Sequence, residues 1–266
     1  MKIAIIGTGN LGKSIAKGLL TNQEITSLYL TKRNTHQIKE FKEYKNVVVT
    51  QDNAVAIQNS DILIIAVQPA QVEQLLTEAK PLLTDKHLII STITGFSIAQ
   101  IEHCVGAQQS IIRAMPNTAI AVGKSMTCIC GNKQAAAHIH IAETIFNQLG
   151  HSLQIPESQM QAATVVCASG IAFWMRLIRA TTQAAIQLGF DAKEAQQLAM
   201  YTSEGAASLL ITNKQHPEQE IDQVTTPKGC TIEGLNEMEH KGLSSSLIQG
   251  MVASFNKINT IKKEQL

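Results

Sequence analysis

Short apolar runs alternate with stretches of helical periodicity along the first 155 residues. The first run, residues 3–6, is uninterrupted, which is typical of a strand buried on both faces of a sheet. A predicted helix begins at about Asn10, and others follow over residues 70–80, 98–104 and 133–149. Strands are predicted at residues 27–30, 47–50, 62–67, 87–91, 110–112, 125–130 and 152–155. This alternation predicts an α/β fold with a doubly wound parallel sheet of the Rossmann type.

The pattern changes at about residue 156, where strand signals stop and long apolar helices begin. Residues 160–188 are predicted to be helical with a break near Ser169 and Gly170, and a helix over residues 192–210 begins at the N-cap Asp191. Both helices carry too many apolar and small residues for a solvated surface, which is typical of helices that pack against another subunit. We therefore predict two domains, an α/β domain over residues 1–155 and an all-helical domain over residues 156–266.

The turn after the first predicted strand has the pattern G-x-G-x-x-G, formed by Gly7, Gly9 and Gly12. In this pattern the first glycine permits a tight turn, the second lets the backbone approach a diphosphate, and the third lets the helix lie close to the strand. An ordinary strand-to-helix turn can produce the same letters, so the motif alone is weak evidence. Here it directly follows a strand and directly precedes an amphipathic helix, whose N-terminal amides favour anions. The sequence therefore predicts a dinucleotide-binding domain.

The end of the second predicted strand offers Thr31, Lys32 and Arg33 but no acidic residue. A carboxylate usually binds the free 2′-hydroxyl of NAD at this position, whereas the 2′-phosphate of NADP requires cations and hydroxyls. The residues therefore favour NADPH, with NADH as the alternative if Lys32 and Arg33 only solvate a loop. Later strand ends, at residues 67–69, 92–94 and 115–117, are expected to line the nicotinamide end, although each is equally compatible with an ordinary turn.

The composition narrows the class of protein further. With 44% hydrophobic and 16% charged residues and a net charge of +1, the chain is typical of a globular protein that binds neither nucleic acid nor a membrane surface. No uninterrupted apolar run reaches the ~18 residues of a membrane span, and no signal-peptide pattern opens the chain, so we expect a cytoplasmic protein. Neither the five cysteines nor the eight histidines have metal-ligand spacing. We predict no metal site and interpret the first four cysteines as buried free thiols.

A second candidate site lies in the helical domain, where residues 224–231 read Val-Thr-Thr-Pro-Lys-Gly-Cys-Thr. The proline and glycine predict a turn, and a helix opens at Thr231 and runs to about residue 240. The free amides of Gly229, Cys230 and Thr231 could then converge on a carboxylate, with the Thr231 hydroxyl beside them. The alternative is a threonine N-cap without a ligand, and these residues alone do not separate the two.

Taken together, the motifs resemble those of the pyrroline-5-carboxylate reductase family, in the same order and over nearly the full length. The resemblance implies a helical dimerisation and substrate domain, a homodimer or higher homo-oligomer, and NADPH-dependent reduction of 1-pyrroline-5-carboxylate to L-proline, the last step of proline biosynthesis. Alternatives are a reductase of another cyclic imine, a 3-hydroxyacid dehydrogenase, or a catalytically weak NADP-binding sensor or interaction protein. The motifs are the glycine turn, Val67-Gln68-Pro69, Ile112-Arg113-Ala114-Met115-Pro116-Asn117-Thr118, Ala168-Ser169-Gly170, His216-Pro217, and residues 224–232.

The resemblance also implies roles for individual residues. The turn at Gly229, Cys230 and Thr231 would hold the substrate carboxylate through backbone amides. The Thr231 hydroxyl would orient the ring nitrogen, and a hydride would pass from C4 of NADPH to C5 of the imine. The residues implied to bind the cofactor are Gly7, Thr8, Gly9, Asn10, Leu11, Gly12, Thr31, Lys32, Arg33, Asn53, Ala66, Val67, Gln68, Pro69, Thr92, Ile93 and Thr94.

Three lysine and glutamine positions depart from the pattern of the family. Lys228 stands where the family usually has the first glycine of a pair, Gln68 where it often has lysine, and Lys214 where an acid is common. A lysine in a glycine position either adds a cation beside the carboxylate site or prevents the glycine geometry. These departures bear on substrate preference and rate rather than on the fold.

Overall fold

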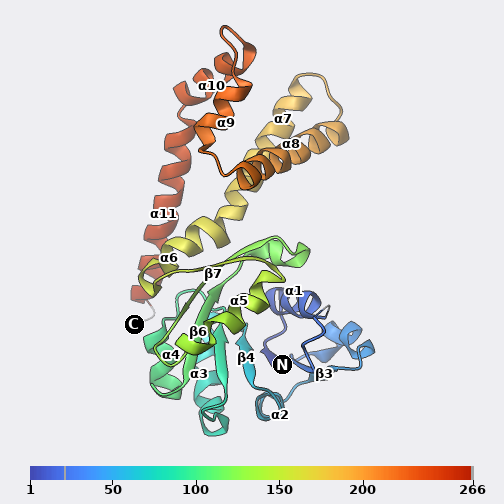
Figure 1. Ribbon diagram of the computed structural model, residues 1–266, viewed down its shortest axis with the longest axis vertical. Helices are drawn as coiled ribbons and strands as arrows, with labels where there is room; N and C mark the ends of the chain where they lie inside the picture. The colour runs from blue at the N-terminus through green and yellow to red at the C-terminus, as the bar shows by residue number, and fades with distance from the viewer. Residues whose placement is uncertain (21, 265–266) are drawn as a thin grey trace. The chain divides into compact units, whose positions relative to one another are not determined.

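The computed structural model describes residues 1–20 and 22–264, and its N-terminal part contains one eight-stranded sheet (Figure 1). The strand order is β3-β2-β1-β4-β5-β6-β7-β8. Strands β1 to β6 are parallel, β7 is antiparallel to β6, and β8 is parallel to β7. This order confirms the predicted doubly wound sheet. The strands are β1 (Lys2–Ile6), β2 (Ser27–Thr31), β3 (Val47–Thr50), β4 (Ile62–Ile65), β5 (Leu88–Ser91), β6 (Ser110–Met115), β7 (Ser125–Gly131) and β8 (Gly150–Gln154).

Helices cover both faces of this sheet, as the buried apolar runs require. One face packs against α1 (Asn10–Leu19), the 3-10 segment η1 (Thr35–Glu43) and α5 (Ile139–Asn147). The opposite face packs against α2 (Asn53–Gln58), α3 (Pro69–Ala79) and α4 (Ile98–Val105). Short 3-10 turns complete this part of the chain, namely η2 (Lys80–Leu82), η3 (Thr118–Val122), η4 (Ala136–His138) and η5 (Glu157–Gln159).

Some boundaries differ from those predicted, for identifiable reasons. β6 continues three residues beyond the predicted end because Arg113, although charged, is buried in the strand and paired with Glu157. β4 ends at Ile65, two residues early, because the chain turns there into α3, whose first residue is Pro69. The helix predicted from residue 133 begins only at Ile139, since the Asn132 side chain accepts the Ala135 amide in a preceding turn.

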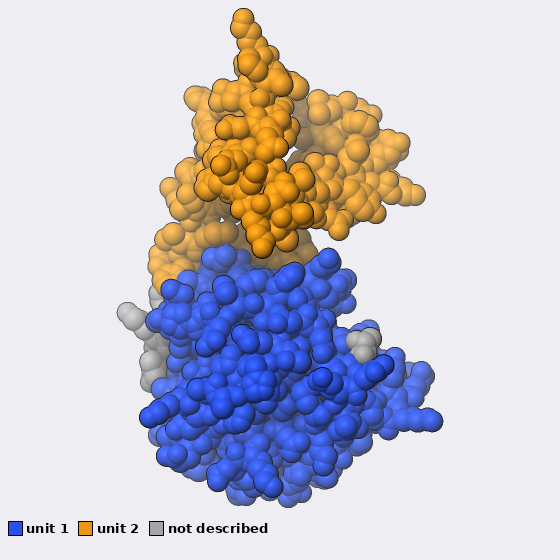
Figure 2. Space-filling model, viewed as in Figure 1, with its two compact units in different colours: residues 1–169, 258–266 blue, residues 170–257 orange. Residues whose placement is uncertain are grey.

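The chain divides into two compact units (Figure 2). Unit 1 contains Met1–Ser169 and the chain from Ile258 onward, and unit 2 contains Gly170–Lys257. The division differs from the predicted boundary after residue 155. The reason is that α6 (Met160–Ala163) and the π-helical turn Thr164–Ser169 bury Met160, Thr164 and Val165 within unit 1.

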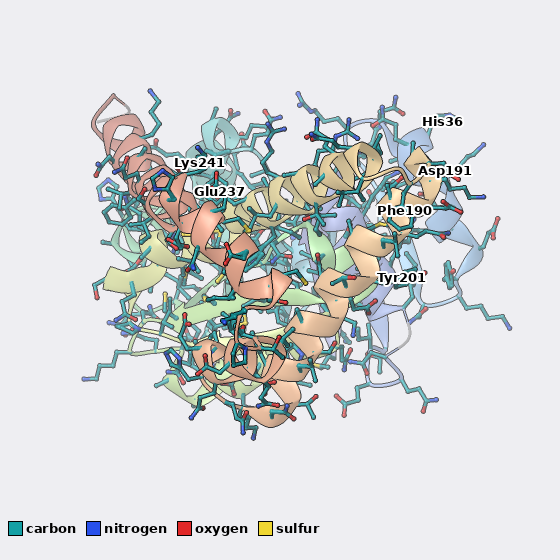
Figure 3. The ribbon with its side chains drawn as sticks, turned by 90° about the horizontal axis from the view of Figure 1, so that it is seen from above. His36, Phe190, Asp191, Tyr201, Glu237 and Lys241 are labelled. Carbon is teal, nitrogen blue, oxygen red and sulfur yellow. The ribbon has the colours of Figure 1, made fainter. Side chains whose placement is uncertain are left out.

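Unit 2 is all helical, as predicted. It comprises α7 (Gly170–Gln187), α8 (Ala192–Asn213), α9 (Pro217–Val224), α10 (Cys230–His240) and most of α11 (Leu243–Glu264). Asp191, labelled in Figure 3, is the N-cap of α8, as predicted. Its side chain accepts hydrogen bonds from the amides of Lys193 and Glu194 at 2.8 and 2.9 Å. Helix α8 ends at Asn213, and Lys214 takes the left-handed conformation after it, with φ of 55°.

The helical part of the chain exposes many large apolar side chains. Trp174 and Tyr201 are 61% and 69% exposed, on α7 and α8 respectively (Figure 3 labels Tyr201). Among the described residues, one stretch, Glu157–Gln187, is long and apolar enough to cross a membrane by length and composition. This stretch contains no uninterrupted apolar run of ~18 residues, and it qualifies because mean hydropathy tolerates its serines and threonines.

Candidate active site

The glycine turn after β1 is shaped by close backbone contacts. Gly7 has φ of +93°, and a Cβ atom added there would lie 2.6 Å from Cγ1 of Val67. A Cβ atom on Gly12 would lie 2.6 Å from the carbonyl oxygen of Gly7. In contrast, a Cβ atom on Gly9 would meet nothing within 4 Å. The fold itself therefore requires Gly7 and Gly12, whereas Gly9 leaves open space at the start of α1, which is the space that a diphosphate needs.

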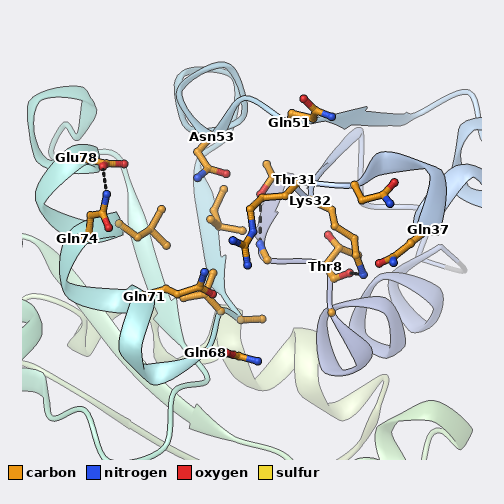
Figure 4. A pocket seen from close by; sticks show the side chains of 18 residues that line it. Thr8, Thr31, Lys32, Gln37, Gln51, Asn53, Gln68, Gln71, Gln74 and Glu78 are labelled. Atoms are coloured by element: carbon orange, nitrogen blue, oxygen red, sulfur yellow. Dashed lines mark hydrogen bonds between the residues drawn. The ribbon is translucent and has the colours of Figure 1, made fainter. Parts of the chain in front are cut away.

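Residues at the end of β2 hold this turn in place. The Gly7 amide donates to the Thr31 hydroxyl at 3.3 Å, and the Thr8 amide donates to the Thr31 carbonyl at 2.8 Å. The Lys32 ammonium donates to the carbonyl oxygen of Thr8 at 2.9 Å (Figure 4). Thr31 is almost fully buried. Its hydroxyl therefore positions the glycine turn, while Lys32 brings a positive charge beside it.

These segments surround a cavity of about 690 Å³, whose lining comes from the carboxyl ends of β1 to β4 and from α3 (Figure 4). Ligands of doubly wound sheets bind at this edge. Lys32 and Arg33 line the cavity after β2, and the acidic side chain in the lining, Glu78, lies on α3 and accepts from Gln74 at 2.8 Å. The set fits an NADP-type cofactor. The predicted cofactor residues in the lining are Gly7, Thr8, Gly9, Thr31, Lys32, Arg33, Asn53, Ala66, Val67 and Gln68.

The sequence analysis missed several polar residues of the cavity. Gln71, Gln74 and Glu78 present one face of α3 to it, with Gln37 and Gln51 from the ends of η1 and β3. The signal was available in part, because positions separated by three, four and seven residues share a helix face. Which face meets the cavity depends on how α3 packs on the sheet, and the apolar residues Val72 and Leu76 decide this by their burial.

Other predicted cofactor residues lie beside the cavity rather than in its lining. Pro69 begins α3, and Asn10, Leu11 and Gly12 form the first turn of α1. Thr92 and Ile93 are buried, and the Thr92 hydroxyl donates to the Ile65 carbonyl at 2.9 Å. Thr94 lines a separate cavity of about 250 Å³ together with Arg113. Cofactor contact at these seven positions stays a prediction.

The predicted substrate site in unit 2 is a β-turn followed by a helix. The Gly229 amide donates to the Thr226 carbonyl at 2.9 Å, and Lys228 has φ of 60°, as the third residue of a type II turn does. Gly229 is the N-cap of α10 and supplies no side-chain cap, so the first amides of the helix have no side-chain acceptor there.

This geometry corrects two expectations. Helix α10 begins at Cys230, so Thr231 lies inside its first turn and the alternative of a Thr231 N-cap is wrong. The Gly229 amide is engaged in the turn, which leaves the amides of Cys230 and Thr231 with the Thr231 hydroxyl as donors for a carboxylate.

Comparisons with known proteins decide the family. A family model described as NADP oxidoreductase, coenzyme F420-dependent, matches residues 2–95, and one described as pyrroline-5-carboxylate reductase dimerisation matches residues 157–261. The chain is 43% identical to pyrroline-5-carboxylate reductase 2 of Dictyostelium discoideum, over 96% of this chain and 91% of that protein. The chain belongs to the pyrroline-5-carboxylate reductase family. The resemblance read from the sequence motifs is therefore confirmed.

Other members support the same assignment. Pyrroline-5-carboxylate reductase 1 of Dictyostelium discoideum is 44% identical over 96% of this chain, and the chain spans 49% of the length of that relative. The structure of a pyrroline-5-carboxylate reductase from Coxiella burnetii matches with a TM-score of 0.91 and 30% identity, covering 97% of each chain. The fold of the family thus extends over both units of this chain.

Proposed function

We propose that this chain is an NAD(P)H-dependent oxidoreductase that reduces 1-pyrroline-5-carboxylate to L-proline. The observation that carries the proposal is the 43% identity to a reductase of that name over nearly the whole length of both proteins. Each unit also holds a suitable site, namely the cavity around Gly9 and the uncapped first turn of α10.

The residues of the cavity divide the binding of the cofactor between them. The open space at Gly9 leaves room for the diphosphate, and the amides at the start of α1 donate hydrogen bonds to it. Lys32 and Arg33 attract the 2′-phosphate, which favours NADPH over NADH. When bound, the nicotinamide supplies a hydride. The protein therefore has to supply placement and a suitable electrostatic environment rather than the redox chemistry itself.

The first turn of α10 would position the substrate. Its amides at Cys230 and Thr231 carry the positive end of the helix dipole and bind the carboxylate, while the Thr231 hydroxyl orients the ring nitrogen. A protonated cyclic imine is already electrophilic at the carbon that is reduced, so orientation supplies most of the required help. The proposed reaction therefore requires no pair of histidine or carboxylate side chains as acid and base.

The test is an assay of the purified chain with NADPH and 1-pyrroline-5-carboxylate, which follows nicotinamide absorbance and identifies proline as the product. We expect Thr231→Ala to lower kcat by about 10- to 100-fold, the loss of one hydrogen bond to a charged group, with little change in NADPH affinity. Thr231→Ser should recover most of the rate. Equal loss of rate and NADPH affinity in Thr231→Ala would contradict the role given to its hydroxyl.

A reductase of another cyclic imine is the alternative that shares every feature of the site. The same assay with a six-membered cyclic imine carboxylate distinguishes the two by kcat/KM. A higher kcat/KM for the larger ring would replace the proposed substrate. Absence of turnover with either imine, despite tight NADPH binding, would favour the sensor alternative.

The proposal includes a homodimer or higher homo-oligomer in the cytoplasm. The supporting observations are the match to a dimerisation family over residues 157–261 and the exposed apolar side chains of α7 and α8. Trp174, the single tryptophan, is 61% exposed, so Trp174→Glu should shift the mass measured by light scattering to that of a monomer. Cell fractionation tests the cytoplasmic location, and recovery in the membrane fraction would instead assign residues 157–187 to lipid.

A further inference from the structure

Two cysteine side chains from distant parts of unit 1 meet beside the sheet. Cys128 is buried on β7, and Cys167 is half-buried in the π-helical turn Thr164–Ser169. Their sulfur atoms lie 3.9 Å apart although 39 positions separate the residues. Both are free thiols in the structure. The site proposed for catalysis uses neither of them.

The π-helical turn fixes the direction of the Cys167 side chain. It follows α6 directly, where the Thr164 hydroxyl donates to the Met160 carbonyl at 2.8 Å, and Val165 is buried. The carbonyl oxygen of Cys167 accepts a 3.1 Å hydrogen bond from the Asn117 side chain. The backbone is therefore held on one side by Asn117, while the thiol faces Cys128. Single π turns of this kind are frequent at functional sites.

The two thiols differ in acidity, which suits them to different steps of one reaction. The hydrogen bond from Cys128 lowers the pKa of Cys167 to about 7, against the opposing effect of burial. The same contact, together with burial, raises the pKa of Cys128. Burial raises the pKa of Cys130, two positions further along β7, to about 11. These opposite shifts favour Cys167 as the attacking thiolate and Cys128 as the thiol beside it.

We propose that Cys128 and Cys167 are a redox modification site that forms a reversible intramolecular disulfide. The oxidant is a peroxide: the Cys167 thiolate attacks one oxygen of hydrogen peroxide, which yields a sulfenic acid and one water after protonation. The Cys128 sulfur then attacks the sulfenic sulfur, the S–S bond forms, and hydroxide leaves as a second water with the Cys128 proton. Two thiols are oxidised, one peroxide is reduced, and a dithiol reverses the change.

The bond would fasten a specific segment of the chain. A disulfide brings its sulfur atoms to about 2.05 Å, so the 3.9 Å separation between the two Sγ atoms has to shorten by about 2 Å. It would join the turn that ends at Ser169, directly before unit 2 begins at Gly170, to the sheet at β7. The consequence is a π turn with less freedom to open in the oxidised protein.

The test oxidises the purified full-length chain with a small excess of hydrogen peroxide, blocks free thiols with iodoacetamide, and maps the peptides by mass spectrometry. We expect a cross-linked peptide pair that joins Cys128 and Cys167, the loss of two of the five thiols, and full recovery with dithiothreitol. Hydrogen exchange should slow in residues 164–169 of the oxidised protein and remain unchanged in the reduced one.

Matched variants decide whether the pair itself is responsible. Cys130→Ser, on the same strand and the same face as Cys128, should still form the cross-link, whereas Cys128→Ser and Cys167→Ser should not. In Cys128→Ser, Cys167 should proceed to the sulfinic acid because its resolving thiol is missing. Should Cys128→Ser fail to fold, Cys128→Ala serves in its place, since it puts no hydroxyl group into this buried position.

Three results would overturn the proposal: Cys167 oxidised to sulfinic acid in the unaltered chain without a cross-link, a disulfide that joins Cys130 or two chains, or unchanged exchange in residues 164–169 after cross-linking. None of these measurements uses the imine or NADPH. If no disulfide formed, the proposed reductase activity would be unaffected. If the chain had no reductase activity, the disulfide would still be expected.

Discussion

The ammonium group of Lys32 donates a 2.9 Å hydrogen bond to the carbonyl oxygen of Thr8, the residue between the first two glycines of the turn. The end of β2 and the glycine turn after β1 are thereby joined by a side chain that also lines the cavity. One residue thus links the part of the site proposed to bind the diphosphate to the part proposed to bind the adenosine ribose.

We expect Lys32→Met to raise the KM for NADPH about tenfold, equivalent to about 1.4 kcal/mol, because a cation near the 2′-phosphate is lost. The KM for NADH should change less. Lys86→Met, which removes an exposed lysine that is not part of the cavity lining, is the control and should leave both constants unchanged. An equal rise for both cofactors would mean that Lys32 acts only on the glycine turn.

The glycines of the turn should separate stability from cofactor binding. Gly7→Ala should destabilise the protein by about 2 kcal/mol or more, because the positive φ and the contact with Val67 both oppose a side chain. Gly9→Ala should leave stability within about 0.5 kcal/mol but weaken NADPH binding, because its methyl group occupies the open space. Urea unfolding and NADPH fluorescence titration measure the two effects, and tight NADPH binding by Gly9→Ala would contradict the assignment of the diphosphate site.

Lys228 is strained as a non-glycine residue in a left-handed conformation. Lys228→Gly should remove strain of about 1–2 kcal/mol but lose roughly 0.5–1 kcal/mol to unfolded-chain entropy, so the free energy of unfolding should stay equal or rise slightly. If the Lys228 ammonium assists carboxylate binding, the KM for the imine should rise in this variant while kcat changes little. Lys228→Asn keeps the turn geometry without the charge and should raise the KM equally, whereas an unchanged KM in both would show that the charge is not used.

Arg113 and Glu157 form a partly buried ion pair, with 2.9 Å between Nη1 and Oε1 and side chains that are 7% and 35% exposed. Glu157→Gln should destabilise by about 2–3 kcal/mol because a buried guanidinium loses its counter-charge. Arg113→Met should lower the free energy of unfolding by less. In that variant the Glu157 carboxylate still accepts the 2.7 Å hydrogen bond from the Ile98 amide and is partly exposed to solvent. Urea unfolding of both variants checks this order, and the reverse order would mean that packing around Arg113 dominates.

The pKa of Cys167 predicts a pH-dependent reactivity. Because a lowered thiol pKa favours the thiolate above that value, alkylation of Cys167 by iodoacetamide should rise through a midpoint at about pH 7. The two causes are the hydrogen bond from Cys128, which lowers the pKa, and burial, which raises it. Cys128→Ala should therefore move the midpoint upward, toward that of an ordinary thiol. Peptide-resolved alkylation rates measure both midpoints, and identical midpoints would exclude the contribution of Cys128.

Much of the α/β part could be predicted because its signals are local. The apolar run of β1, the glycine turn and α1 follow one another directly, so neighbouring residues suffice to define them. Arg113 shows where this fails: a charge in a buried strand is unfavourable until Glu157, 44 positions later, supplies its partner. The sequence pattern ended the strand before it for that reason.

In the candidate site, too, residues identified by local sequence signals were predicted, and residues that depend on packing were missed. Gly7, Gly9 and Lys32 were found from motif and position, and the structure places them around one cavity. Gln71 and Gln74 were missed because the packing of α3 decides which of its faces meets the cavity. The engagement of the Gly229 amide depends on a turn whose third residue is a lysine, where residue preferences would have favoured glycine.

The direction of β7 and β8 also governs where the polypeptide departs from the sheet. A helix that follows one of the parallel strands β1 to β6 runs back toward the edge where those strands begin. Strand β8 points the other way, so the helical turns after it run toward the edge where β1 to β6 end. They arrive beside Asn117, which holds the Cys167 carbonyl just past the end of β6. If β7 and β8 had been parallel to the other strands, the chain would have left unit 1 at the opposite edge of the sheet. The direction of these two strands therefore determines where the helical unit begins.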